Sequence, residues 1–182
     1  MDSDPLDVPT MSALVSKLID LRATRFQNGA LFLDRDGVLN IDKGYVYRWQ
    51  DFEWITGARD LIRAFNAAGW PVIVVTNQSG VARGVYDEAD IRALHASVTE
   101  DLSKQGAHID AFYHCPFHKD GVVEAYRITD HPARKPNPGM LLRAATDHDI
   151  QLERAIMFGD NLSDVDAATR AGARVFLFQA PN

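Results

Sequence analysis

Cysteine is almost missing from this sequence of 182 residues: Cys115 stands alone, so no internal disulfide framework can form. Long apolar runs are missing too, and the longest, such as Pro71–Val75, are far shorter than the roughly 20 residues of a membrane-spanning helix. The first residues include Asp2, Asp4 and Asp7 instead of the basic and apolar segments of a signal peptide. We therefore expect a cytoplasmic protein without a membrane partner.

A basic excess is also lacking, because 19 Lys and Arg stand against 25 Asp and Glu and the net charge is −6. We expect no nucleic-acid partner, since proteins of that class carry a basic footprint. The length allows one full core, which we place in residues 30–182, after an N-terminal extension at 1–29. Apolar residues at helical spacing predict a short helix over Met11–Arg22 in that extension. We expect a monomer or a weak homodimer.

Short apolar runs alternate with helical patterns along the rest of the chain. This alternation predicts an α/β fold, a doubly wound, Rossmann-like parallel sheet whose strands are buried on both faces. The predicted strands are Ala30–Asp34, Pro71–Thr76, Asp110–His114, Arg154–Gly159 and Arg174–Phe178. The predicted helices are Ala58–Ala68, Glu88–Gln105, Gly139–His148 and Ser163–Ala171.

Two segments do not follow the alternation. Residues 38–56 are rich in aromatic side chains and indicate a hairpin or flap, and residues 115–137 form a long loop of the kind that is usually functional. Neither is long enough for a lid domain, so we expect a minimal cap and an open site.

Polar side chains follow several predicted strands at the point where each strand ends, which is where ligands bind in such sheets. Asp34 and Asp36 follow the first strand and Asp160 follows the fourth. Three converging carboxylates repel one another unless a cation lies between them, and hard oxygen ligands suit Mg²⁺. A lone Asp-x-Asp-Gly is more often a turn or a helix cap. The series of strand-end signals in order favours a magnesium site.

Groups that could hold an anion accompany these carboxylates. Thr76 and Asn77 supply a hydroxyl and an amide, Lys135 supplies a positive charge, and a helix N-terminus near Gly80 would point backbone amides at a phosphate. The pattern therefore predicts a phosphate-handling site.

Four segments of the chain resemble the haloacid-dehalogenase (HAD) superfamily, and within it the heptose-1,7-bisphosphate and histidinol-phosphate phosphatases. The segments are Leu33–Asn40, Thr76–Gly84, Arg134–Met140 and Gly159–Asp164. The resemblance covers about residues 30–178 and implies a HAD-type fold and a Mg²⁺-dependent phosphatase that acts through an aspartyl-phosphate. The substrate it implies is a small sugar phosphate.

The resemblance also implies roles for individual residues. Asp34 would be the nucleophile and Asp36 the general acid and base. Thr76 and Lys135 would hold the phosphoryl oxygens. Mg²⁺ would be bound by Asp34, by the main-chain carbonyl of Asp36 and by Asp160.

Further residues match the family's substrate pocket: Asp42, Lys43, Gly44, Tyr45, Asn77, Gln78, Ser79, Arg134 and Asn161. Arg134 would hold a second phosphate, since a guanidinium suits bidentate recognition, whereas Asn161 stands where the family often has lysine. The preferred activity is hydrolysis of D-glycero-D-manno-heptose 1,7-bisphosphate to the 1-phosphate. Two alternatives stay open: a phosphatase of histidinol phosphate or another small monoester, and a non-catalytic binding module.

The family's loop before the Arg-Lys-Pro segment usually holds a structural zinc through three cysteines and a histidine. Here Phe117 and Ala133 occupy two of the four ligand positions, so the regular site is broken and we expect no structural zinc. An improvised site around Cys115, His118 and His131 stays open as an alternative.

Overall fold

The computed structural model describes residues 28–178, which form one five-stranded sheet with the strand order β3-β2-β1-β4-β5. Every strand pairing is parallel. The strands are β1 Leu31–Leu33, β2 Val72–Asn77, β3 Ala111–Cys115, β4 Ile156–Gly159 and β5 Arg174–Leu177. The sequence prediction of the sheet is confirmed, with small differences at the strand ends.

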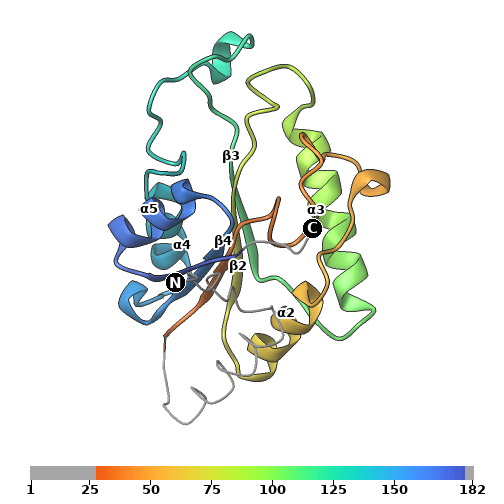
Figure 1. Cartoon of the computed structure of the whole chain (residues 1–182), viewed down its shortest axis with the longest axis vertical. Coiled ribbons are helices and arrows are strands. Elements are labelled where there is room, and N and C mark those ends of the chain that lie inside the picture. The colour runs from red at the N-terminus through yellow and green to blue at the C-terminus, as the bar shows by residue number, and fades with distance from the viewer. Residues whose placement is uncertain (1–27, 179–182) are drawn as a thin grey trace, which may run out of the picture.

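The helices lie on both faces of the sheet, with α4 and α5 on one side and α2 and α3 on the other (Figure 1). They are α2 Ala58–Ala67, α3 Glu88–Ser103, α4 Gly139–Asp147 and α5 Leu162–Ala171, and short 3₁₀ helices occur at Trp49–Asp51, Glu124–Tyr126 and Leu152–Arg154. The predicted doubly wound architecture is therefore present. The helix predicted over Met11–Arg22 lies outside the described residues.

Alternation along β1 divides the core into two layers. Leu31 and Leu33 pack in the cluster that contains Leu61 of α2, whereas Phe32 packs in the cluster that contains Leu141 of α4. All three strand residues are fully buried. Successive side chains of a strand point to opposite faces, so a continuous apolar run is the pattern expected for a strand covered on both sides.

The helix after β2 begins at Glu88, as its pattern predicts. The separate expectation of a helix N-terminus near Gly80 is wrong. Residues 79–85 form turns, in which the backbone N–H of Val85 donates to the carbonyl of Gly80 at 2.9 Å. Asp87 caps the helix, because its carboxylate accepts from the first free N–H groups of α3. The free N–H groups at the N-terminus of α3 are therefore bonded by Asp87.

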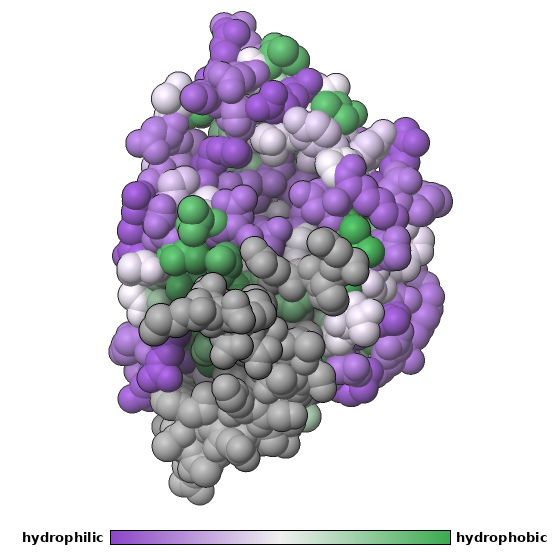
Figure 2. Space-filling view, viewed as in Figure 1, coloured by the Kyte–Doolittle hydropathy of each residue, from purple (hydrophilic) through white to green (hydrophobic). Residues whose placement is uncertain are grey.

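Two loops lie on either side of the carboxyl edge of the sheet. Residues 38–56 form the predicted flap, closed by an antiparallel bridge between Asn40 and Trp54, and Trp54 donates to Asp101 of α3 at 2.9 Å. Residues 116–138 extend from β3 to α4 on the other side (Figure 1). The facing surface is mainly hydrophilic, and its hydrophobic side chains lie in small separate groups (Figure 2). Within residues 28–178, no helix is long and apolar enough to cross a membrane.

Candidate active site

A pocket of about 460 Å³ opens at the carboxyl edge of the sheet, between the flap and the loop after β3. It is lined by Asp34, Asp36, Asp42, Gly44, Tyr45, Thr76, Asn77, Gln78, Ser79, Tyr86, Arg134, Lys135, Asp160, Asn161 and Ser163. The structure thus brings together every residue predicted for the site except Lys43. The exposed Lys43 ammonium pairs with Glu53 at 2.9 Å and does not line the pocket.

Asp34 and Lys135 form the centre of the site. The backbone N–H of Asp34 donates to the carbonyl of Phe158 on β4, and Oδ1 of Asp34 lies 2.9 Å from Nζ of Lys135. The same ammonium donates to the carbonyl of Val75 at 2.9 Å and pairs with Oδ1 of Asp164 at 2.6 Å. Burial alone would lower the pKa of Lys135, but Asp34 and Asp164 more than offset this and raise it. The lysine is therefore a fixed cation.

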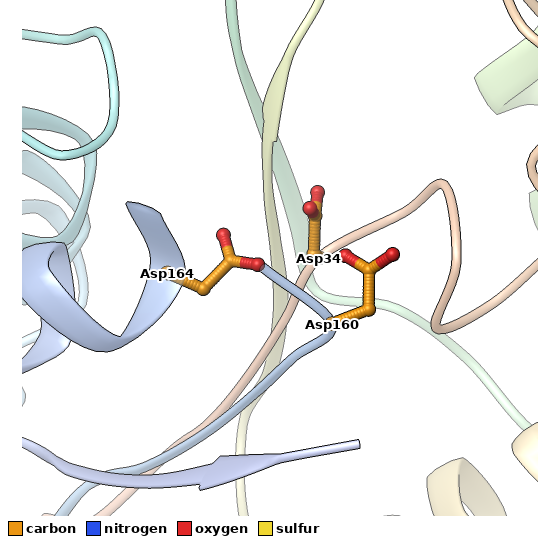
Figure 3. Close-up of side chains that lie close together, drawn as sticks. All are labelled: Asp34, Asp160 and Asp164. Carbon is orange, nitrogen blue, oxygen red and sulfur yellow. The ribbon is translucent and has the colours of Figure 1, made fainter. Parts of the chain in front are cut away.

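Three carboxylates converge beside this lysine. Asp34, Asp160 and Asp164 each place an oxygen within 4.8 Å of the others (Figure 3). Burial, with repulsion from Asp164, raises the pKa of Asp34 to about 7 and that of Asp160 to about 6, although Lys135 acts in the opposite direction. Lys135 alone thus leaves the cluster short of positive charge. A divalent cation would lower both pKa values, so the donor set fits Mg²⁺.

Asp164 is the site residue that the sequence reasoning missed. The predicted metal ligands were Asp34, Asp36 and Asp160, but the carboxylate of Asp36 lies outside the cluster, which leaves its main-chain carbonyl as its predicted contribution. Asp164 accepts from the backbone N–H of Asn161 at 3.1 Å and so belongs to the capping box of α5. The sequence signal that could have identified Asp164 is its short spacing from Asp160, within the segment that resembles the family.

Two glycines leave the space that these carboxylates occupy. A Cβ atom on Gly37, which has φ +85°, would collide with the side chain of Asp160. A Cβ atom on Gly159 would collide with the side chain of Asp164. Both glycines are therefore required by close approach, and Gly37 also by its left-handed backbone conformation.

Thr76 and Asn77 are the last two residues of β2, and both line the pocket. Thr76 is 1% exposed and lies at the floor of the pocket. The amide of Asn77 donates to the carbonyl of Lys135 at 3.0 Å and accepts from its N–H at 3.1 Å. Asn77 thereby fixes the backbone that carries the central lysine.

Arg134 and the flap residues form the outer part of the pocket. Nη1 of Arg134 donates to the carbonyl of Phe117 at 3.1 Å, and burial, with repulsion from Arg83, lowers its pKa. On the flap, Oδ1 of Asp42 accepts from the N–H of Gly44 at 2.8 Å, which orders the turn before Tyr45. The pocket thus has a second cationic side chain besides Lys135.

Two side chains of the alternative zinc site, His118 and His131, bond to backbone N–H groups of the 115–137 loop. The ring of His131 stacks on Phe117 with centroids 4.0 Å apart, and its Nδ1 accepts from the N–H of Ala133. Nδ1 of His118 accepts from the N–H of Asp120. Within residues 28–178, the acidic cluster is the only group of three or more potential metal-binding side chains, and it excludes Cys115 and both histidines.

Comparisons with known proteins agree with this geometry. A family model described as HAD-hydrolase-like matches residues 132–179. The chain is 46% identical over 151 residues to the D-glycero-β-D-manno-heptose-1,7-bisphosphate 7-phosphatase of Rhodopseudomonas palustris, covering 82% of this chain and 83% of that protein. It is 45% identical to the α-anomer enzyme of Campylobacter jejuni, covering 78% and 77% respectively.

Solved structures give the same result. A HAD-like phosphatase from Mesorhizobium loti superposes with a TM-score of 0.79 at 41% identity, covering 82% of this chain and 71% of that one. The D,D-heptose 1,7-bisphosphate phosphatase of B. bronchiseptica, solved with magnesium and phosphate, has a TM-score of 0.74 at 34% identity, covering 82% and 79%. The chain therefore belongs to the haloacid-dehalogenase superfamily, as a phosphoric monoester hydrolase of the group that includes the heptose-bisphosphate phosphatases.

Proposed function

We propose that this phosphatase transfers the phosphoryl group of a sugar phosphate to Asp34 and then to water. The observation that carries the proposal is the position of Asp34, which lies in the pocket at the end of β1, paired with Lys135 and beside Asp160. A carboxylate held in this way is a nucleophile of the kind that forms aspartyl-phosphates.

In the first step an oxygen of Asp34 attacks phosphorus and forms a P–O bond while the bond to the sugar oxygen breaks. Asp36 gives its proton to the leaving oxygen. In the second step water attacks the same phosphorus, Asp36 takes a proton from it, and the bond to Asp34 breaks. Lys135 and Thr76 hold the other phosphoryl oxygens throughout, since phosphoryl transfer depends mainly on positioning and charge stabilisation.

Magnesium, when bound by Asp34, Asp160 and the main chain of Asp36, would reduce the repulsion between the nucleophile and the phosphate. Asp164 completes the acidic cluster and also pairs with Lys135. The proposal is supported by the B. bronchiseptica relative, which was solved with magnesium and phosphate.

We propose D-glycero-D-manno-heptose 1,7-bisphosphate as the substrate and its C7 phosphate as the group removed. Relatives that are 42–46% identical carry this activity in their names, some for the α and some for the β anomer. Arg134 is the cationic side chain that lines the pocket besides Lys135, and its guanidinium suits the second phosphate. Turnover of both anomers, compared with histidinol phosphate and simple sugar monophosphates, tests the assignment. Faster hydrolysis of histidinol phosphate than of either anomer would contradict it.

The covalent route is tested with Asp34→Asn, which keeps the shape of the side chain and removes its attacking charge. We expect kcat to fall by several orders of magnitude while the far-ultraviolet circular dichroism is unchanged. The wild type, quenched in acid during turnover of a ³²P-labelled substrate, should carry label that the variant lacks. A variant that keeps more than about a tenth of the wild-type activity would rule out Asp34 as the nucleophile.

A further inference from the structure

The carboxylate of Asp36 is held by three buried neighbours outside the acidic cluster. Nη2 of Arg35 lies 2.8 Å from Oδ2, Nδ2 of Asn40 donates to Oδ1 at 3.0 Å, and Nε2 of Gln78 donates to Oδ2 at 2.9 Å. All three neighbouring residues are at most 2% exposed. A carboxylate that accepts from three fixed donors has one favoured orientation.

The amide of Gln78 is saturated by protein groups. Its Nε2 donates to Asp36 and, at 2.9 Å, to Oγ1 of Thr76, while its Oε1 accepts from Nη2 of Arg35 at 3.2 Å and from the hydroxyl of Tyr86 at 2.6 Å. A carboxylate only accepts and a guanidinium only donates, so the chemistry of these neighbours fixes which way the amide points. Both donor and both acceptor positions of Gln78 are thus occupied without a substrate.

Tyr86 and Arg35 join this network to the flap. The ring of Tyr86 stacks on Tyr47 with centroids 5.0 Å apart, and Nη2 of Arg35 donates to the carbonyl of Val46 at 2.6 Å. Tyr86 is 7% exposed and reaches the pocket wall. The orientation of Asp36 is therefore linked to the flap and to the turns after β2.

We propose that Arg35, Gln78 and Tyr86 are positioning residues that aim the carboxyl group of Asp36 at the oxygen of the leaving group. This inference rests on the proposed role of Asp36 as general acid. It assigns Gln78 to the support of Asp36 instead of the substrate contact expected from the family resemblance. A badly aimed acid slows only those reactions whose leaving group needs a proton, so the signature is selectivity for the leaving group.

The test compares kcat/KM for a primary sugar phosphate with kcat/KM for 2,4-dinitrophenyl phosphate, whose leaving group departs without protonation. This parameter reports the steps up to transition-state formation for the first phosphoryl transfer. Tyr86→Phe removes the hydroxyl and keeps the ring stacked on Tyr47. We expect a loss of about tenfold on the sugar phosphate, the size of one broken hydrogen bond in such a network, and less than about twofold on the aryl ester.

Gln78→Met is the second variant, because it removes all four hydrogen bonds of the amide, including the one to Asp36, while keeping a similar volume. It also frees Thr76, and that effect falls on both esters equally, so the ratio of the two losses is the readout. We expect the loss in kcat/KM on the sugar phosphate, divided by the loss on the aryl ester, to be larger than for Tyr86→Phe. It should approach about a hundredfold, since small misplacements of a catalytic group can cost this much. A ratio near one would overturn the inference even if Tyr86→Phe failed to fold.

Two controls separate the possible outcomes. Tyr113→Phe removes a hydroxyl that donates to Asp147 at 2.8 Å outside the pocket, and should leave both rates unchanged. Asp36→Asn calibrates the acid role: equal losses on the two esters would overturn that role and this inference with it. A selective loss in Asp36→Asn combined with equal or absent losses in Tyr86→Phe and Gln78→Met would overturn the inference alone.

Discussion

Nζ of Lys135 lies 2.9 Å from Oδ1 of Asp34, and neither side chain is more than 13% exposed. The same ammonium lies 2.6 Å from Oδ1 of Asp164, which is fully buried. One buried cation thus balances part of the charge of two carboxylates. Removal of one member of such a group leaves an uncompensated buried charge, which costs more than the pair itself contributes.

We therefore expect Lys135→Met to lower the free energy of unfolding of the metal-free protein by about 3–5 kcal/mol. Urea denaturation followed by circular dichroism measures this loss. Lys104→Met, which breaks an exposed pair with Glu100 of α3, should leave the stability nearly unchanged, because exposed ion pairs contribute little. Addition of Asp164→Asn to Lys135→Met should recover part of the loss, and a failure to recover any would contradict the charge-balance argument.

The acidic cluster makes a prediction about metals. Protein treated with a chelator should lose activity and regain it with added Mg²⁺, because Asp34, Asp160 and Asp164 lack sufficient positive charge. Elemental analysis after purification should find almost no zinc, since Phe117 and Ala133 occupy two of the four ligand positions of the family's zinc site. One tightly bound equivalent of zinc would contradict the second statement, and full activity in the chelator would contradict the first.

Arg134 should distinguish substrates with one phosphate from those with two. Its guanidinium is held at the pocket wall by the carbonyl of Phe117, and a charged hydrogen bond to a distal phosphate is worth about 1.5–3 kcal/mol. Arg134→Ala should lower kcat/KM for the bisphosphate by roughly ten- to a hundredfold and barely change that for a monophosphate.

A matched control for Arg134→Ala is Arg127→Ala, an exposed arginine of the same loop that does not line the pocket. This control should leave kcat/KM for both substrates unchanged. If Arg134→Ala slowed the two substrates equally, the arginine would support the loop or the reacting centre, and the bisphosphate assignment would lose one of its two supports.

His95 should make the fold sensitive to acid. Burial, with smaller contributions from Arg35 and His114, lowers the pKa of His95 from 6.5 to about 3, and the ring stacks on Phe112. Between these two pKa values the unfolded chain binds more protons than the folded one, so the stability falls as the pH falls through this range. His95→Phe should flatten the slope of unfolding free energy against pH between about 4 and 6.5.

The control for His95→Phe is the exposed His108, whose replacement by Gln should leave the slope unchanged. Both variants are compared with the wild type by urea denaturation across the pH series. An unaltered slope in His95→Phe would show that groups other than His95 cause the acid sensitivity.

Local patterns were sufficient to predict the sheet, its covering helices and most of the site. The apolar runs within Ala30–Asp34 and Pro71–Thr76 predicted strands buried on both faces, because period and composition are local properties. Asp34, Thr76 and Asp160 could be expected to meet, because the carboxyl ends of parallel strands share one edge of the sheet. The resemblance to a family supplied their roles.

Other features depended on contacts between distant segments. Asp164 occupies a capping-box position, which by itself indicates only the start of α5; it joins the acidic cluster because Gly159 leaves room for it and Lys135 arrives from another loop. Lys43 and Tyr45 are near neighbours in one turn, yet only Tyr45 faces the pocket, since positive φ angles at Gly44 and Tyr45 turn the chain between them.

The sequence by itself thus determined the fold class, the order of strands and helices, and the residue types of the site, because each follows from periodicity or from a short motif. Only the tertiary structure decided which polar groups are free to bind a substrate and which form hydrogen bonds with one another. Gln78 shows the reason: its amide is occupied by Arg35 and Tyr86 as well as by Asp36. Hydrogen-bond saturation is a property of the packed site, and no one-dimensional pattern records it.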